Sequence, residues 1–218
     1  MKKEAQKNFA IAISFLAAFA LWTLAIRFVD VQPIGPQESS VGFAILNGWI
    51  HRLTGVHMSL YVITDWLGLI PLGFVFGFGI LGLVQWIQRK KLHLVDFSIL
   101  VLGEFYLIVM AVFLLFEVYV VNYRPVLIEG ILEVSYPSST TLLVMCVMPT
   151  AFMQLHDRIQ NPLLNRCVCL AITVFIAFMV VGRLLSGVHW VTDIIGGALL
   201  SASLVTMYRS VISLKQPK

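Results

Sequence analysis

Charged residues are scarce in this sequence, and their scarcity excludes an ordinary soluble domain. Asp, Glu, Lys and Arg make up 12% of the 218 residues, against roughly 25% in a typical globular chain. Hydrophobic residues make up 59%, and the mean hydropathy is +0.92. The sequence contains long apolar runs, and a helix needs about 20 such residues to cross a bilayer. The composition therefore predicts an integral membrane protein.

Cysteine is also rare. The three cysteines, Cys146, Cys167 and Cys169, lie in or beside apolar segments. They lack the spacings that are typical of metal sites and of redox-active pairs. We therefore interpret all three as small packing residues.

The excess of basic over acidic residues is small, 15 against 11, which gives a net charge of +4. In a membrane protein, Lys and Arg gather in the cytoplasmic loops, and this tendency accounts for the excess. The charge balance therefore indicates no nucleic-acid partner.

The apolar runs predict an all-α fold, an integral membrane bundle of six transmembrane helices that forms a single membrane domain over residues 1–218. The first run opens like a secretory signal, but it is long and no clear cleavage site follows, so we expect it to be retained. The long linker between the first two spans contains "VGFAILNGWIHRLTG", which predicts a short amphipathic helix in the membrane interface. The six spans are expected near residues 8–29, 66–88, 95–121, 140–156, 167–185 and 190–212.

The distribution of Lys and Arg predicts the orientation of these spans. Six spans place both termini on one side, and that side would hold eleven of the 15 basic residues. Basic residues favour the cytoplasm, so the termini are expected to be cytoplasmic. Four basic residues fall on the opposite, extracytoplasmic side: Arg27, Arg52, Arg124 and Arg183.

Three polar clusters fall on that extracytoplasmic side. They are "NYRP" at residues 122–125, "SYPSSTT" at 135–141 and "GRLLSGVHWVTD" at 182–193. Each cluster alone has a plain interpretation: an interfacial Arg anchors a helix, and Ser or Thr before an apolar run caps one. Antiparallel packing of spans three to six would bring the three clusters together, and the combination favours a shared pocket.

The residue types in these clusters suit phosphoryl transfer. Arg124 and Arg183 offer planar, multi-donor groups for phosphate oxygens. The start of the fourth span adds backbone N–H donors. His189 and Asp193 are spaced i, i+4 at the start of the sixth span, so they are expected to share one helical face. The carboxylate would then orient the imidazole while the other ring nitrogen attacks phosphorus. The positive charges supply the electrostatic stabilisation, so we expect no metal and no cofactor.

The same residues resemble the motifs of the phosphatidic acid phosphatase type 2 family of lipid phosphatases, which is related to vanadium haloperoxidases. The family pattern is K-x6-R-P, P-S-G-H and S-R-x5-H-x3-D. The third motif matches at Arg183, His189 and Asp193, with Gly182 in place of Ser. The first keeps Arg124 and Pro125, and the second keeps Pro137 and Ser138.

The resemblance implies a catalytic phosphatase-like core over residues 95–213. It implies that His189 is the nucleophile that forms a phosphohistidine and that Asp193 is its orienting partner. It further implies that Arg124, Arg183 and Ser138 bind phosphate, and Ser139 is expected to do so with them. We expect a bacterial plasma-membrane protein whose site faces away from the cytoplasm and whose partners are the bilayer and a lipid phosphate or diphosphate.

Two positions depart from the family pattern. Glu117 stands where the family has a phosphate-binding Lys. Either this carboxyl group is uncharged because it is desolvated, or it faces Arg124 along the helix. Thr140 stands where the family has the His that protonates the leaving group. Thr140 is either a weak proton relay or a cap.

General acid catalysis is worth about 10²–10⁴-fold, so its loss impairs a phosphate monoesterase most. The leaving group of a lipid diphosphate has a low pKa and needs less protonation. The sequence therefore favours a polyprenyl diphosphate phosphatase or phosphotransferase. The alternative is a non-catalytic lipid-phosphate binder or carrier that has lost two catalytic positions. The oligomeric state is left open.

Overall fold

The computed structural model describes residues 2–214, and within them every regular element is helical. Apart from the helices, the described residues form only isolated bridges between single pairs of residues. This confirms the all-α prediction. The elements are α1 (Lys2–Phe28), η1 (Pro36–Glu38), α2 (Ala44–Thr54), α3 (Met58–Leu67), α4 (Leu69–Arg89), η2 (Leu92–Leu94), α5 (Phe97–Val118), α6 (Ser139–His156), α7 (Pro162–Leu185) and α8 (Val191–Ser213).

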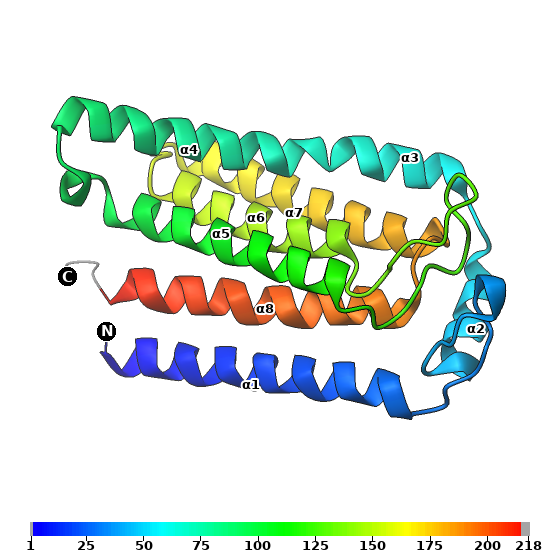
Figure 1. Cartoon of the computed structure of the whole chain (residues 1–218). Coiled ribbons are helices and arrows are strands. Elements are labelled where there is room, and N and C mark those ends of the chain that lie inside the picture. The colour runs from blue at the N-terminus through cyan, green and yellow to red at the C-terminus, as the bar shows by residue number, and fades with distance from the viewer. Residues whose placement is uncertain (1, 215–218) are drawn as a thin grey trace.

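The long helices lie side by side along one axis, with α6 in the middle of the bundle (Figure 1). Helix α6 contacts α4, α5, α7 and α8, and α1 packs along α8. Helix α2 and the loop between α5 and α6 gather at one end of the bundle (Figure 1). Helix α1 begins, and α8 ends, near the opposite end.

Five stretches are long and apolar enough to cross a membrane, judged by length and composition. Helix α6 is not among them, so the predicted count of six spans is not confirmed. Its neighbours bury much of α6, and its polar side chains bond to protein inside the bundle: Thr150, for example, donates to the carbonyl of Cys146 at 2.9 Å. Hydrogen bonds of this kind remove the cost of burying polar groups in a helix that its neighbours enclose. The five stretches are Glu4–Phe28, Met58–Arg89, Phe97–Val118, Pro162–Leu185 and Val191–Ser213.

The second span begins earlier than predicted. Its expected start near residue 66 is wrong, because α3 begins at Met58 and continues into α4 with only a brief interruption at Gly68. The backbone of Gly68 is helical, with φ −59° and ψ −17°. Asp65 therefore lies within the last turn of a helix. The sequence suggested a boundary here because a carboxylate is unfavourable in an apolar span unless it has a partner.

The segment predicted to form an interfacial helix is helical, as α2. Its location at the membrane surface stays a prediction. The interpretation of the three cysteines as packing residues is right for Cys146, which is fully buried. It is wrong for Cys167 and Cys169, which are exposed on α7.

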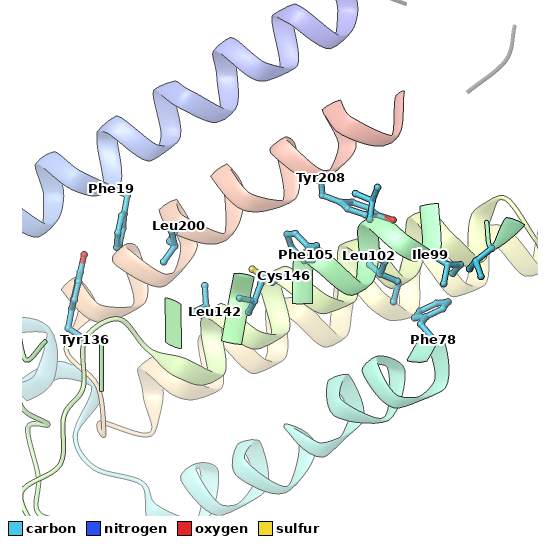
Figure 2. Packing of buried hydrophobic residues seen from close by; sticks show 14 of the residues in the cluster. Phe19, Phe78, Ile99, Leu102, Phe105, Tyr136, Leu142, Cys146, Leu200 and Tyr208 are labelled. Atoms are coloured by element: carbon cyan, nitrogen blue, oxygen red, sulfur yellow. The ribbon is translucent and has the colours of Figure 1, made fainter. Parts of the chain in front are cut away.

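Aromatic and aliphatic side chains from α1, α5, α6 and α8 fill the main core, as Figure 2 shows for Phe19, Leu142, Leu200 and Tyr208. Tyr136 stacks on Phe19, with ring centroids 6.2 Å apart. The Tyr136 hydroxyl also lies 2.7 Å from the hydroxyl of Thr23. These contacts fix the loop before α6 against α1.

Gly196 in α8 provides the space for Tyr136. A Cβ atom added at Gly196 would lie 2.5–2.7 Å from three atoms of the Tyr136 side chain. We predict that Gly196→Ala destabilises the protein by about 1–3 kcal/mol, because overpacking displaces a buried ring. Thermal unfolding in detergent tests this. Gly79→Ala is the matched control: nothing lies within 4 Å of the added Cβ, and an unchanged or slightly higher Tm is expected. Equal effects of the two substitutions would contradict the prediction.

Candidate active site

The hydroxyl-rich segment before α6 caps that helix. Ser138 is the N-cap residue, and its hydroxyl accepts a hydrogen bond from the backbone N–H of Thr141 at 3.4 Å. The backbone N–H of Ser138 donates to the carbonyl oxygen of Asp193 at 3.1 Å. The starts of α6 and α8 are thus joined directly, as the sequence clusters predicted.

His189 and Asp193 lie together at the start of α8. Helix α8 begins at Val191 with Trp190 as its N-cap, so His189 precedes the helix. The predicted shared helical face is therefore wrong, and the capping turn brings the two residues together instead. His189 Nδ1 lies 3.8 Å from Asp193 Oδ2, which is a close approach but too long for a hydrogen bond.

The Asp193 carboxylate is held by two other donors. The backbone N–H of Trp190 donates to Oδ2 at 2.9 Å. The Asn122 amide donates to Oδ1 at 3.2 Å. Asp193 is fully buried, so these bonds compensate for the solvation that the carboxylate loses.

His189 is buried, and neither of its ring nitrogens has a hydrogen-bond partner among the described residues. Burial, together with the positive charges of Arg124 and Arg183, lowers the pKa of His189 to about 4 against the opposing effect of Asp193. The imidazole is therefore neutral at neutral pH. A neutral ring keeps the lone pair that a nucleophile needs.

Arg124 lies in the loop after α5 and is largely buried. Its Nε atom lies 3.0 Å from Glu133 Oε2, and Nη1 has no hydrogen-bond partner among the described residues. Helix α5 ends at Val118, so Glu117 and Arg124 do not share a helical face. Arg124 pairs with Glu133 and not with Glu117.

Arg183 is also buried, in the last turn of α7. Its Nε atom donates to the Thr140 hydroxyl at 2.9 Å. Its Nη1 atom donates to the carbonyl of Tyr61 and to the hydroxyl of Thr64, both at 3.3 Å, and Nη2 donates to Asp65 Oδ1 at 3.1 Å. Arg183 is thus bonded to protein groups, most of them from α3.

A small pocket, with a cavity volume of about 20 Å³, brings several of the predicted residues together. His189, Arg124, Ser139 and Glu117 all line it, with apolar side chains around them. Ser138 and Arg183 do not line it, although each bonds to a neighbouring element as described above. The full lining is Phe113, Phe116, Glu117, Arg124, Val134, Ser135, Tyr136, Pro137, Ser139, Leu142 and His189.

A larger, mostly apolar groove, with a cavity volume of about 370 Å³, adjoins this pocket between α4, α5 and α6. The two cavities share Phe113, Ser139 and Leu142. Asp65 and Thr140 supply polar atoms at the groove. A long apolar chain in the groove would have its polar end near His189.

The contribution of α2 to the site was not predicted from the sequence. The Asn47 amide donates to the Thr192 hydroxyl at 3.0 Å, and His51 Nε2 lies 3.1 Å from the Gly187 carbonyl oxygen, which makes that nitrogen the donor. Gly187 has φ +70°, and a Cβ there would lie 2.1 Å from the Gly55 carbonyl oxygen. These contacts hold the His189 loop in place. The sequence feature that could have indicated Asn47 and His51 is the polar face of the predicted amphipathic helix.

Asp65 and Tyr61 were also missed. The Tyr61 ring centroid lies 4.9 Å from Cζ of Arg183 and 5.9 Å from Cζ of Arg124, so this ring contacts both cations. Asp65 could have been singled out from the sequence, because it is a carboxylate at the start of a predicted span. Among the described residues, no three His, Cys, Asp or Glu side chains are grouped as a metal site requires.

Comparisons with known proteins agree with this arrangement. A family model described as the PAP2 superfamily matches residues 104–216. No curated protein matches the chain. A solved structure is similar to it: the crystal structure of the first transmembrane PAP2 type phosphatidylglycerolphosphate phosphatase from Bacillus subtilis. The TM-score is 0.56 and the identity 19%, and the match covers 94% of this chain and 97% of that chain. At this identity the likeness concerns the fold.

We predict that acid destabilises the protein partly through His189. The pKa of His189 is about 4 in the folded chain and about 6.5 when unfolded. The unfolded chain therefore binds the extra proton first, so this contribution to stability is present above about pH 6.5 and is lost as the pH falls towards 4. Thermal unfolding of the wild type and His189→Gln between these pH values measures it. The wild type should lose more stability than His189→Gln as the pH falls. Parallel pH profiles of the two proteins would contradict the contribution of His189.

Proposed function

The chain belongs to the PAP2 superfamily, and from this membership we propose that it is a membrane lipid phosphatase that acts through a phosphohistidine intermediate. The observation that carries the proposal is the pairing of a buried, neutral His189 with Arg124 in one pocket. The Nε2 atom of His189 is the nucleophile, because Nδ1 faces Asp193. The catalytic core lies within residues 95–213.

The first step transfers the phosphoryl group to His189. The lone pair of Nε2 forms a bond to phosphorus while the bond from phosphorus to the leaving oxygen breaks, and the electron pair goes to that oxygen. Asp193 orients the ring and stabilises the positive charge that develops on it. In the second step water attacks the phosphohistidine, inorganic phosphate leaves and His189 is regenerated. The positive charges present make a metal ion unnecessary for these steps.

The phosphate oxygens are held by groups around the start of α6. The Nη1 atom of Arg124 has no other partner among the described residues. The backbone N–H groups of Ser139 and Thr140 are in the first helical turn, where the helix itself offers no acceptor. The hydroxyls of Ser138 and Ser139 and the guanidinium of Arg183 complete the set.

Thr140 favours a diphosphate substrate. Its hydroxyl accepts a hydrogen bond from Arg183, so its own hydrogen is free to donate to a phosphate oxygen. A hydroxyl is nevertheless a poor proton donor to an alkoxide. A lipid diphosphate leaves as a phosphate ester of low pKa, and a polyprenyl diphosphate of this kind is the substrate we favour. The similar Bacillus subtilis protein is described as a phosphatidylglycerolphosphate phosphatase.

The rest of the molecule suits this reaction in a membrane. The groove between α4, α5 and α6 receives the lipid tail. Helix α6 crosses the bilayer as a sixth span, and α2 lies in the interface. The termini are cytoplasmic, and the site opens on the extracytoplasmic side of a bacterial plasma membrane.

A lipid-phosphate carrier is the second candidate. It is favoured by Glu117 in the pocket and by the carboxylates that already pair with both arginines, since these anions oppose phosphate binding. Against it, a carrier has no need for a buried nucleophile beside an Asp.

The substrate preference predicts the outcome of a phosphate-release panel with purified protein in detergent. We expect faster release from a polyprenyl diphosphate than from phosphatidate or phosphatidylglycerolphosphate. Thr140→His should raise monoester turnover by about 10²-fold, because it restores a general acid. His189→Ala should lower all turnover by about 10⁴-fold or more, while His93→Ala, an exposed histidine at the opposite end, should not. A wild-type preference for monoesters would overturn the diphosphate assignment.

Chemical trapping separates the enzyme from the carrier. Wild-type protein mixed with ³²P-labelled substrate and quenched rapidly should carry an acid-labile, base-stable label, as a phosphohistidine does. His189→Ala should carry none. Saturable substrate binding without any label in the wild type would instead support the carrier.

A further inference from the structure

The second step of the proposed reaction needs a base, whatever the substrate is. In a two-step hydrolysis the group that protonates the leaving oxygen in the first step takes a proton from water in the second, by microscopic reversibility. Thr140 stands where the family has that group, and a hydroxyl is poor at both tasks. A diphosphate relieves the first step, because its leaving group needs little protonation. The second step gains nothing from this, because the phosphohistidine is the same for every substrate.

The pocket beside His189 contains one group that can act as this base. The cavity volume is about 20 Å³, which is room for about one water molecule, so a group in the pocket lies beside both His189 and Glu117. Arg124 lines the pocket too, but a guanidinium stays protonated and accepts no proton. The Tyr136 hydroxyl lies 2.7 Å from the hydroxyl of Thr23 on α1 and is engaged there. Among the described residues, Glu117 is the only carboxylate that lines the pocket.

The other carboxylates near the site already have partners. Glu133 and Asp65 each pair with an arginine, at 3.0 and 3.1 Å. Asp193 is fully buried and accepts hydrogen bonds from a backbone N–H and from a side-chain amide. None of these three lines the pocket. Glu117, in contrast, has neither an ion pair nor a hydrogen bond within the described part of the chain.

Glu117 lies at the end of a span, where a proton can be returned to water. Helix α5 has 22 residues and ends at Val118, one residue after Glu117. A helix of this length is about 33 Å long, slightly more than the roughly 30 Å of hydrocarbon in a bilayer. The carboxyl group is therefore close to the membrane–water interface. A base has to give up its proton once in every turnover, and this position allows it.

We propose that Glu117 is a further catalytic residue: the general base that takes a proton from the water that attacks the phosphohistidine. The proposal rests on the proposed function and deepens it. The water oxygen forms a bond to phosphorus while the bond from phosphorus to Nε2 of His189 breaks, and the electron pair of that bond returns to Nε2. The water proton passes to the Glu117 carboxylate and then to solvent. Inorganic phosphate leaves, and both side chains return to their starting states.

The negative charge of Glu117 matters less in this step than in the first. A carboxylate weakens the binding of a phosphate that is held only by non-covalent contacts. In the phosphohistidine the phosphoryl group is attached covalently, so repulsion does not release it. Arg124 lines the same pocket, and its Nη1 atom has no hydrogen-bond partner among the described residues, so its positive charge offsets the two anions. The Lys that the family has at this position binds phosphate, but in its protonated form it accepts no proton.

Rapid-quench labelling of the full-length protein in detergent tests this base. The probes are a polyprenyl diphosphate and phosphatidate, each with ³²P in its terminal phosphate, and protein-bound label and free phosphate are measured in the same samples. Glu117→Gln keeps the shape of the side chain and removes the base. Glu117→Ala is measured with and without formate, a small carboxylate. Glu104→Gln is the matched control, because Glu104 is exposed on the same helix and lines neither cavity.

Glu117→Gln should release phosphate about 10²-fold more slowly than the wild type, while label accumulates on His189 towards one phosphoryl group per chain. Formate should speed release from Glu117→Ala and leave the wild type unchanged, and Glu104→Gln should match the wild type in label and release. Release from Glu117→Gln as fast as from the wild type would overturn the proposal, because Glu117 would then only repel phosphate. Loss of label together with release would also overturn it, because the first step needs no base.

The proposed phosphatase function fails by a different result. A wild type that carries no label and releases no phosphate from any lipid would remove the function, and the base with it. A wild type that is labelled and releases phosphate, beside a Glu117→Gln variant that behaves identically, would leave the function standing and remove only the base.

Discussion

The positive charge of Arg183, buried among apolar helices, is the constraint on which the rest of the site depends. A guanidinium inside a low-dielectric bundle must have its donors matched by acceptors. The acceptors come from α3 and α6, and Arg183 itself lies on α7. Three helices are thereby held in one register at the end of the bundle where α2 lies, and the Tyr61 ring extends the arrangement to Arg124. The contacts that position Arg183 and Arg124 are therefore also the contacts that pack the helices at this end of the bundle.

The second element of the site is the junction between the starts of α6 and α8. One hydrogen bond, from the Ser138 N–H to the Asp193 carbonyl, connects the start of α6 to the capping turn that holds His189 and Asp193. Asp193 also closes the capping turn of its own helix through the Trp190 N–H. Its carboxylate therefore has a local structural role besides the role it is given towards His189. A substitution there would affect the helix start as well as the imidazole.

The sequence predicted those parts of the molecule that local pattern determines. Apolar runs predicted the long helices, and the hydroxyl cluster predicted the cap at Ser138. The grouping of His189, Arg124 and Ser139 followed from antiparallel packing of the spans. Asp65, Asn47 and His51 could not be assigned in this way, because each contacts a residue more than 100 positions away. Such pairs depend on how α2 and α3 dock against α7 and α8, and neither periodicity nor composition contains that information.

The docking of α2 and α3 has a consequence for the modularity of the chain. The part that resembles a phosphatase core begins after α4, yet it does not contain the groups that bond Arg183 through Nη1 and Nη2 or those that hold the His189 loop. Expressed alone, that part would expose a buried cation and release the loop at Gly187. The first ninety residues thus supply part of the scaffold of the site. A chimaera that exchanged them for another membrane anchor would have to reproduce Asn47, His51, Tyr61 and Thr64 to keep the site in place.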